Sequence, residues 1–339
     1  NIVSMDTDRP AMATISVLLV LSSLLLSSCF RAAESIGVCY GRIGTGLPSA
    51  ADVVALYKSN GIAQMRIYSP EKPVLDALRG SGIEIILDVP KSDLQSLASN
   101  AAAANTWVRN NVKAFSPGVR FKYIAVGNEI HPGDAAAGSL LQAMENILSA
   151  VAAAGLQNQI KVSTAIDMTI IGNSFPPDKG VFIDGAKRYM EPVVKFLARN
   201  GSPLLANVYP YFAHKGDPNK VPLPYALFEK PAGYRSLFDA QVDAIYAALE
   251  KSGGGGVRIV VSESGWPSQG GESATVQNAA TYYRNLIKHV KGGTVKKATP
   301  IETYLFAMFD ENQKGGDETE RHFGLFSPDK RPKYQISFN

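Results

Sequence analysis

Apolar runs typical of buried strands alternate along this chain with stretches whose apolar residues recur at helical spacing. Residues 257–261 are representative, because Val257, Ile259, Val260 and Val261 are β-branched or apolar at positions that face both sides of a strand. Runs of this kind predict strands at residues 36–41, 63–69, 84–90, 121–130, 160–167, 203–212, 258–267 and 303–311.

Helical spacing fills the intervals between these runs, with Pro near several starts and Gly just past several ends. Helices are predicted after Pro48, after Pro70, and over residues 94–115, 139–154, 184–200, 234–251 and 273–291. Eight strands that alternate with helices in a chain of 339 residues match an α/β fold consisting of a single (β/α)8 TIM barrel. A doubly wound sheet is the alternative, but it rarely contains eight units of such even spacing.

The first 35 residues have the pattern of a targeting segment. Residues 15–26 are apolar or Ser, a run too short to span a bilayer but suited to the core of a signal peptide. Ala33 and Ser35 occupy the small-residue positions before an expected cleavage at Ile36. We therefore assign residues 1–35 to a signal peptide with possible upstream residues and residues 36–339 to the (β/α)8 barrel, and we expect no membrane association after the signal is removed.

Charge and cysteine content exclude several classes of function. The formal charge is +4 and Lys and Arg are scattered, without the continuous basic stripe that nucleic-acid binding requires. Cys29 would leave with the signal peptide, and Cys39 is expected to be a small buried apolar residue. The histidines show no metal-ligand spacing, and the glycines of residues 41–46 match neither a dinucleotide fingerprint nor a P-loop. We predict neither a metal nor a cofactor.

Two glutamates stand where apolar strands end. Glu263 follows the run 258–262, and Glu129 ends the run 121–128. A carboxylate at the end of a buried strand is costly unless it is paired or neutralised, so each residue either caps a neighbour or belongs to a site. In a barrel both would lie at the carboxyl ends of the strands, where active sites form. Paired carboxylates are the minimum machinery for cleaving a glycosidic bond.

Aromatic and polar residues gather at the same predicted strand ends. Aromatic faces stack on sugar rings, while carboxylates, amides and Lys hold hydroxyl groups; core packing is the alternative for each aromatic residue. The candidates for substrate binding are Tyr68, Asn128, Tyr209, Phe212, Trp266, Glu311 and Lys314.

Sequence motifs across residues 36–338 resemble those of the plant β-1,3-glucanases of glycoside hydrolase family 17. The matching segments are IGVCYG at 36–41, MRIY at 65–68, VGNE at 126–129, LLANVYPYF at 204–212, VVSESGWPS at 260–268, FAMFDENQK at 306–314 and FGLF at 323–326. This resemblance implies a (β/α)8 barrel and endo-hydrolysis of 1,3-β-D-glucosidic bonds with retention of configuration. It further implies Glu129 as proton donor, Glu263 as nucleophile, Glu311, Lys314 and Glu320 as a supporting polar network, and Phe323 as a substrate-binding residue.

Two further features bear on the expected function. Many relatives carry Asn where this chain has Asp310, so an extra acid there is expected to perturb the pH response of the site. The chain ends at Asn339 without the vacuolar extension of many relatives, which favours secretion to the apoplast or cell wall over the vacuole. We expect a monomer whose partner is β-1,3-glucan. A catalytically silent glucan-binding protein and a glucan transglycosylase on the same scaffold are the alternative functions.

Overall fold

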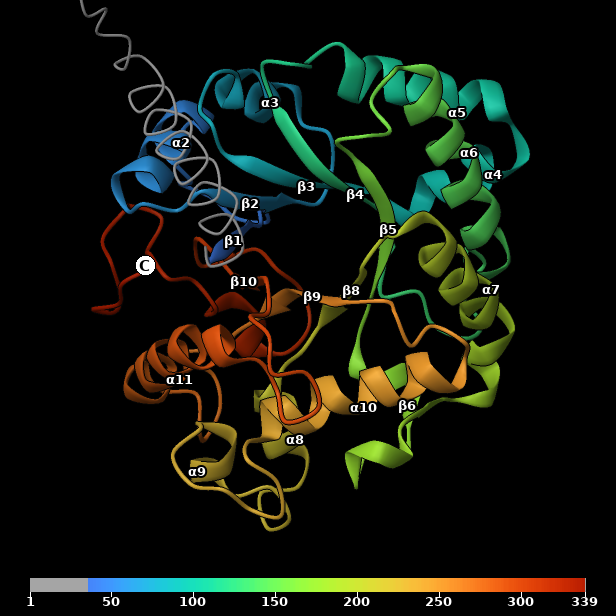
Figure 1. The fold of residues 1–339 in the computed structure, drawn as a ribbon. Coiled ribbons are helices and arrows are strands. Elements are labelled where there is room, and N and C mark those ends of the chain that lie inside the picture. The colour runs from blue at the N-terminus through green and yellow to red at the C-terminus, as the bar shows by residue number, and fades with distance from the viewer. Residues whose placement is uncertain (1–35, 339) are drawn as a thin grey trace, which may run out of the picture.

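The computed structural model describes residues 36–338, so the predicted signal peptide lies outside the described residues. Parallel strands close into a barrel in the order β1-β10-β9-β8-β5-β4-β3-β2 (Figure 1). The predicted (β/α)8 barrel is confirmed. Its strands are β1 (Gly37–Tyr40), β2 (Gln64–Ile67), β3 (Glu84–Val89), β4 (Arg120–Asn128), β5 (Lys161–Ile166), β8 (Leu204–Asn207), β9 (Ile259–Ser264) and β10 (Thr303–Leu305).

Helices surround the barrel (Figure 1). The main helices are α2 (Ala50–Ser59), α3 (Lys72–Leu78), α4 (Leu94–Ser99), α5 (Ala101–Val108), α6 (Leu140–Ala153), α7 (Asp184–Asn200), α10 (Leu237–Lys251) and α11 (Val276–His289). Of these, α2, α5, α10 and α11 each begin after a capping side chain. Ser49, Asn100, Ser236 and Thr275 each accept a hydrogen bond from a backbone N–H of the helix that follows. The predicted helix at 94–115 is divided, because Asn100 leaves the helical conformation to cap α5, and a π-helical turn follows at Arg109–Lys113.

Several short elements were not predicted. A hairpin of β6 (Ile171–Gly172) and β7 (Val181–Phe182) precedes α7, while α8 (Pro210–Gly216) and α9 (Leu223–Ala226) precede α10. The strands predicted at 203–212, 258–267 and 303–311 are too long, because buried loop residues continue the apolar pattern beyond the last strand residue. Short 3-10 helices cover Lys91–Asp93, Ala137–Ser139, Met168–Ile170, Pro177–Lys179, Val290–Gly292 and Glu318–Arg321.

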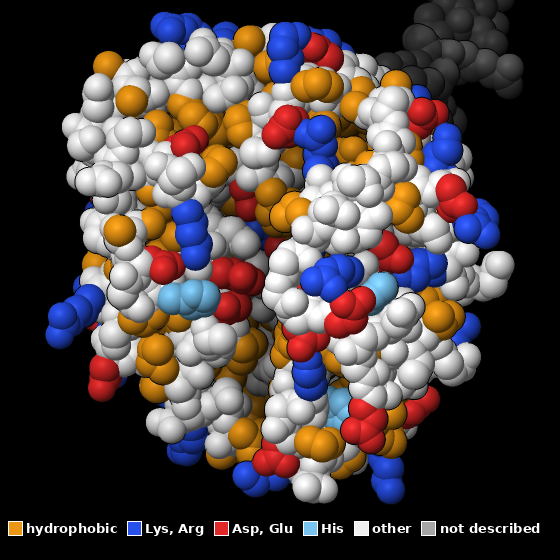
Figure 2. All heavy atoms as spheres, turned by 180° about the vertical axis from the view of Figure 1, so that it is seen from behind, with side chains coloured by type: hydrophobic (Ala, Val, Ile, Leu, Met, Phe, Trp, Pro, Cys, Tyr) orange, Lys and Arg blue, Asp and Glu red, His pale blue; other side chains and the backbone are white. Residues whose placement is uncertain are grey.

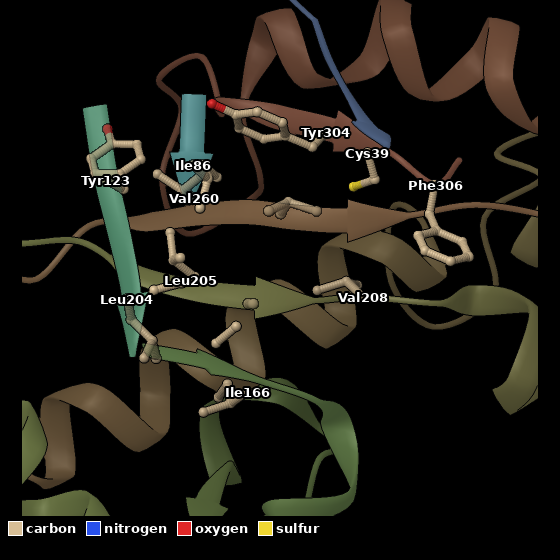
Figure 3. Close-up of a cluster of buried hydrophobic side chains, with 14 of the residues drawn as sticks. Cys39, Ile86, Tyr123, Ile166, Leu204, Leu205, Val208, Val260, Tyr304 and Phe306 are labelled. Atoms are coloured by element: carbon tan, nitrogen blue, oxygen red, sulfur yellow. The ribbon is translucent and has the colours of Figure 1, made fainter. Parts of the chain in front are cut away.

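Side chains from neighbouring strands fill the barrel interior. Ile86, Leu205, Val260 and Tyr304 come from β3, β8, β9 and β10 and lie in one buried cluster (Figure 3). Cys39 lies in this cluster, fully buried and free, and its thiol donates a hydrogen bond to the Ser262 carbonyl at 3.2 Å. Its predicted role as a small buried residue is confirmed. Within residues 36–338, no helix is both long and apolar enough to cross a membrane.

Candidate active site

The backbone turns sharply where β4 ends. Gly127 has φ +74°, and Glu129 has φ +52°, a value uncommon for a residue with a side chain. The Glu129 N–H donates to the Ala165 carbonyl of β5 at 2.9 Å, which holds this conformation. The Glu129 side chain lines the cleft described below. A residue kept in a sparsely populated conformation at a cleft is typical of a functional position.

Glu263, on β9, is surrounded by hydrogen-bond donors. Its Oε1 accepts from Arg66 Nη1 at 2.9 Å and from the Tyr68 hydroxyl at 2.7 Å. Its Oε2 accepts from the Tyr209 hydroxyl at 2.6 Å. The carboxylate is buried, yet a cation and two hydroxyl groups satisfy it. These hydrogen bonds fix both carboxylate oxygens in place.

Glu129 has the opposite surroundings. One neutral donor reaches it, since Asn207 Nδ2 donates to Glu129 Oε1 at 2.8 Å. Burial, and then the nearby charge of Glu263, raise the pKa of Glu129 from 4.5 to about 7. The carboxyl therefore holds a proton up to near-neutral pH. Two carboxyl groups in one cleft, one held by a cation and two hydroxyl groups and the other with a raised pKa, match the division into nucleophile and acid.

Arg66, on β2, connects the polar residues at the base of the cleft. It is completely buried and forms a two-point ion pair with Asp88 of β3, at 3.1 Å from Nε and 2.7 Å from Nη2. The same guanidinium donates to Asn128 Oδ1 at 2.8 Å and to Asn207 Oδ1 at 3.0 Å. Burial raises the pKa of Asp88 to about 6, although the Arg66 charge opposes the rise. With Glu263 included, residues from four other strands, β3, β4, β8 and β9, are thereby fixed to one planar cation on β2.

Two adjoining cavities, of about 710 and 420 Å³, share Glu129 and Glu263 and therefore form one cleft. We call the larger the Tyr68 cavity and the smaller the Phe212 cavity. Figure 2 shows a long groove with acidic side chains near its middle, as expected for a cleft that holds both glutamates. Among the predicted binding residues, Tyr68, Asn128, Glu311 and Lys314 line the Tyr68 cavity, and Tyr209, Phe212, Lys314, Glu320 and Phe323 line the Phe212 cavity.

Trp266 lines neither cavity, so its predicted contact with substrate is wrong. Its side chain is completely buried, and its indole N–H donates to the Ser273 carbonyl at 2.9 Å. The ring packs edge-on against Tyr211, with centroids 5.1 Å apart, and Tyr211 in turn packs against the exposed Phe212, with centroids 5.3 Å apart. The position at a strand end was correct, but the chain turns there so that the indole is buried and is connected to the rim of the cleft through Tyr211.

Glu311 and Lys314, which were predicted to belong to a supporting polar network, both line the Tyr68 cavity. Glu311 accepts from the Ile43 N–H at 2.9 Å, and burial raises its pKa. Lys314 pairs with Glu320 at 2.9 Å. Gly41 makes room for this arrangement, since a Cβ there would lie 2.4 Å from the Glu311 carboxyl group. A side chain at position 41 would displace Glu311.

Asp310 faces away from this network. Its carboxylate pairs with Lys333 at 2.7 Å and accepts from the Gly324 N–H at 2.8 Å, and it lines neither cavity. Because Lys333 neutralises it, the expectation that this acid alters the pH response of the site finds no support in the structure.

Several site residues were absent from the sequence-based candidates. Arg66 and Asn207 stood at recognised strand ends but were not assigned to the site, and Asp88 was overlooked. Asp88 did carry a signal, because an acid inside the apolar run 85–89 must have a partner. Gln241 of α10 also lines the Phe212 cavity, and no strand-end pattern marks it. Among the described residues, no group of three or more potential metal ligands is present.

Comparison with known proteins extends over nearly all described residues. The model of the family Glycosyl hydrolases family 17 matches residues 36–338. A glucan endo-1,3-beta-glucosidase of Vitis vinifera is 58% identical over 334 residues, covering 95% of this chain and 97% of the relative. A basic vacuolar isoform of such an enzyme from Nicotiana plumbaginifolia is 52% identical, covering 98% of this chain and 93% of the relative. The structure of CJP38, a beta-1,3-glucanase and allergen of Cryptomeria japonica pollen, has a TM-score of 0.87 and 48% identity, covering 90% of this chain and 99% of that one. These matches confirm the resemblance seen in the motifs, and the chain belongs to glycosyl hydrolase family 17.

Proposed function

We propose that this protein hydrolyses internal 1,3-β-D-glucosidic bonds of β-1,3-glucan, with retention of configuration at the anomeric carbon. Membership of family 17 and the activity named for its relatives support the reaction and the substrate. One observation carries the mechanism: the same cleft contains Glu263 held by Arg66, Tyr68 and Tyr209, and Glu129 with a pKa of about 7.

In the first step, an oxygen of Glu263 attacks the anomeric carbon, and the bond from that carbon to the departing glucosyl oxygen breaks. Glu129 transfers its proton to the departing oxygen, so that the leaving chain departs as a neutral alcohol. The product of the step is a glucosyl ester of Glu263. Tyr68 and Tyr209 keep the Glu263 oxygens oriented before the attack.

In the second step, water replaces the ester. Glu129, now ionised, accepts a proton from water as the water oxygen attacks the anomeric carbon, and Glu263 leaves as a carboxylate. Glu129 thereby regains its proton and Glu263 its charge. Two displacements at one carbon restore the original configuration.

The shape of the cleft supports cleavage within a chain. Two cavities extend in different directions from the shared glutamates, which leaves room for sugar residues on either side of the reacting bond. Phe212 is 40% exposed at the rim of its cavity and offers an aromatic face to a sugar ring. We further propose a monomer that acts outside the cell, and fractionation of a tagged full-length protein would test the location.

The proposal is tested by incubating the mature protein with linear β-1,3-, β-1,4- and mixed-linkage glucans. Rapid shortening of the β-1,3-glucan, with an initial β-anomer by NMR, is the expected result. An initial α-anomer would refute retention. Products longer than the starting oligosaccharide would instead indicate a transglycosylase, and binding without any new reducing ends would indicate a silent glucan-binding protein.

A further inference from the structure

We infer that Gln241 is a specificity-determining residue, whose carboxamide binds a hydroxyl group of a glucosyl unit in the Phe212 cavity, away from the bond that is cleaved. This inference rests on the proposed glucanase function and adds a residue to it. Gln241 lies on α10, the helix that follows β8 and its connecting loops, and its side chain forms part of the cavity wall.

The side-chain oxygen of Gln241 lacks a hydrogen-bond partner among the described residues. The residue is only 8% exposed, and its Oε1 is buried without a partner among the described residues. A buried amide that leaves its hydrogen bonds unmade costs free energy, so native proteins rarely keep one without a reason.

The other polar groups of this cavity are already engaged. The Asp167 carboxylate accepts a hydrogen bond from the Thr169 hydroxyl at 2.5 Å and contacts His131 Nε2 at 2.8 Å. The Tyr209 hydroxyl donates to Glu263, and Lys314 pairs with Glu320. Among the described polar residues of this wall, Gln241 is the one with a buried side-chain oxygen that makes no hydrogen bond to another described residue. It can therefore meet a ligand without first breaking an internal contact.

The rest of the cavity suits a sugar ring. Phe212, Phe323 and Tyr209 form an aromatic cluster, with centroids 5.5 Å apart for Phe212 and Tyr209 and 6.2 Å apart for Phe212 and Phe323. Met168 and Ala213 add apolar surface. A glucose ring that stacks its apolar face on Phe212 presents its hydroxyl groups at the ring edge, where a carboxamide can donate and accept. Gln241 would thus form directional hydrogen bonds with hydroxyl groups, while the aromatic cluster supplies non-directional apolar contact.

The test compares wild type with Gln241→Met, which keeps the length of the side chain but removes its hydrogen bonds. The control is Gln277→Met on α11, an exposed Gln that lines no part of the cleft. Initial rates are measured with β-1,3-linked glucose oligosaccharides of increasing length. We expect the ratio of kcat/KM for long over short oligosaccharides to fall about tenfold in Gln241→Met, mainly through KM. The same ratio should be unchanged in Gln277→Met.

Thermal unfolding separates binding from structure. Gln241→Met removes an unsatisfied buried polar group, so its melting temperature should equal or exceed that of wild type. Two results would overturn the role of Gln241. One is a ratio of kcat/KM for long over short oligosaccharides equal to that of wild type; the other is an equal loss of kcat/KM at all oligosaccharide lengths together with a lower melting temperature. Failure of wild type to cleave any of these oligosaccharides would instead overturn the proposed function.

Discussion

The amide nitrogen of Asn207 lies 2.8 Å from Oε1 of Glu129, and no other described side chain donates a hydrogen bond to that carboxyl group. The oxygen of the same amide accepts from Arg66, which is paired with Glu263. One neutral side chain thus connects the proposed proton donor, Glu129, with the proposed nucleophile, Glu263. Asn207 favours the ionised form of Glu129 only weakly, which leaves burial free to raise the pKa.

Alanine substitutions should separate the roles of the two glutamates. Glu263→Ala should lose turnover on every substrate, because no glucosyl ester can form. Glu129→Ala should lose turnover on glucan but keep far more on an aryl glucoside whose leaving group needs no proton. Azide should then accelerate Glu129→Ala and give a β-glucosyl azide, whereas rescue of Glu263→Ala should give the α-azide. Interchanged responses would mean that the acid and the nucleophile have been assigned the wrong way round.

The pH dependence of activity should follow Glu129. Its pKa of about 7 predicts that kcat/KM falls as pH rises through about 7, because the acid loses its proton. The charge of Asp167 contributes to the raised pKa of Glu129, so Asp167→Asn should move this alkaline limb to lower pH. Asp178→Asn, at an exposed position outside the cleft, is the control. An alkaline limb that moved upward in Asp167→Asn would contradict the electrostatic account.

Stability should also depend on pH through Glu129. Its pKa rises from 4.5 to about 7 on folding, so the native protein binds more protons than the unfolded chain between these values, and stability is lost as pH increases across this window. The shift corresponds to about 3 kcal/mol. Glu129→Gln cannot ionise, so its free energy of unfolding relative to wild type should increase between pH 4.5 and pH 7. Denaturant titrations at several pH values provide the measurement, and a constant difference would refute it.

The sequence predicted the barrel because apolar runs alternate with helical spacing along the chain. It predicted the positions of both glutamates at strand ends because each one stands where an apolar run ends. Trp266 shows where such patterns fail: the turn after β9, which depends on the packing of Tyr211 and Tyr282, directs the indole into the interior. The sequence-based prediction missed Gln241 for another reason. It comes from a helix, and only the position of α10 beside the cleft, which no periodicity contains, brings it to the substrate side.

Asp88 should matter for stability as much as for activity. Its removal leaves Arg66 buried with Glu263 as its remaining charged partner. Asp88→Asn should therefore reduce the free energy of unfolding by about 3–5 kcal/mol, as expected when one partner of a buried ion pair is lost. Asp52→Asn, which removes an exposed partner of Lys330, should change it far less, because solvent screens that pair. Equal effects of the two substitutions would show that the buried network contributes little.

The thiol of Cys39 should be unreactive in the native protein. It is completely buried, and burial raises the pKa of its thiol, so both access and thiolate formation are suppressed. A thiol-specific chromogenic reagent added to the mature protein should react only as fast as the protein unfolds. The rate should therefore increase with denaturant in parallel with the loss of activity, and rapid reaction under native conditions would contradict this burial.

Arg66, Asp88 and Asn128 come from β2, β3 and β4, whereas Asn207 and Glu263 come from β8 and β9. Neither half of the chain therefore contains a complete site, and every contact of Arg66 with Asn207 or Glu263 crosses between the halves. Catalytic turnover therefore requires that the eight-stranded barrel be closed. A polypeptide with all its helices formed, but with the ring still open between β1 and β10, would show helical circular dichroism without cleaving substrate. Two co-expressed fragments, divided between β5 and β8, would be active only when they associate into a closed barrel.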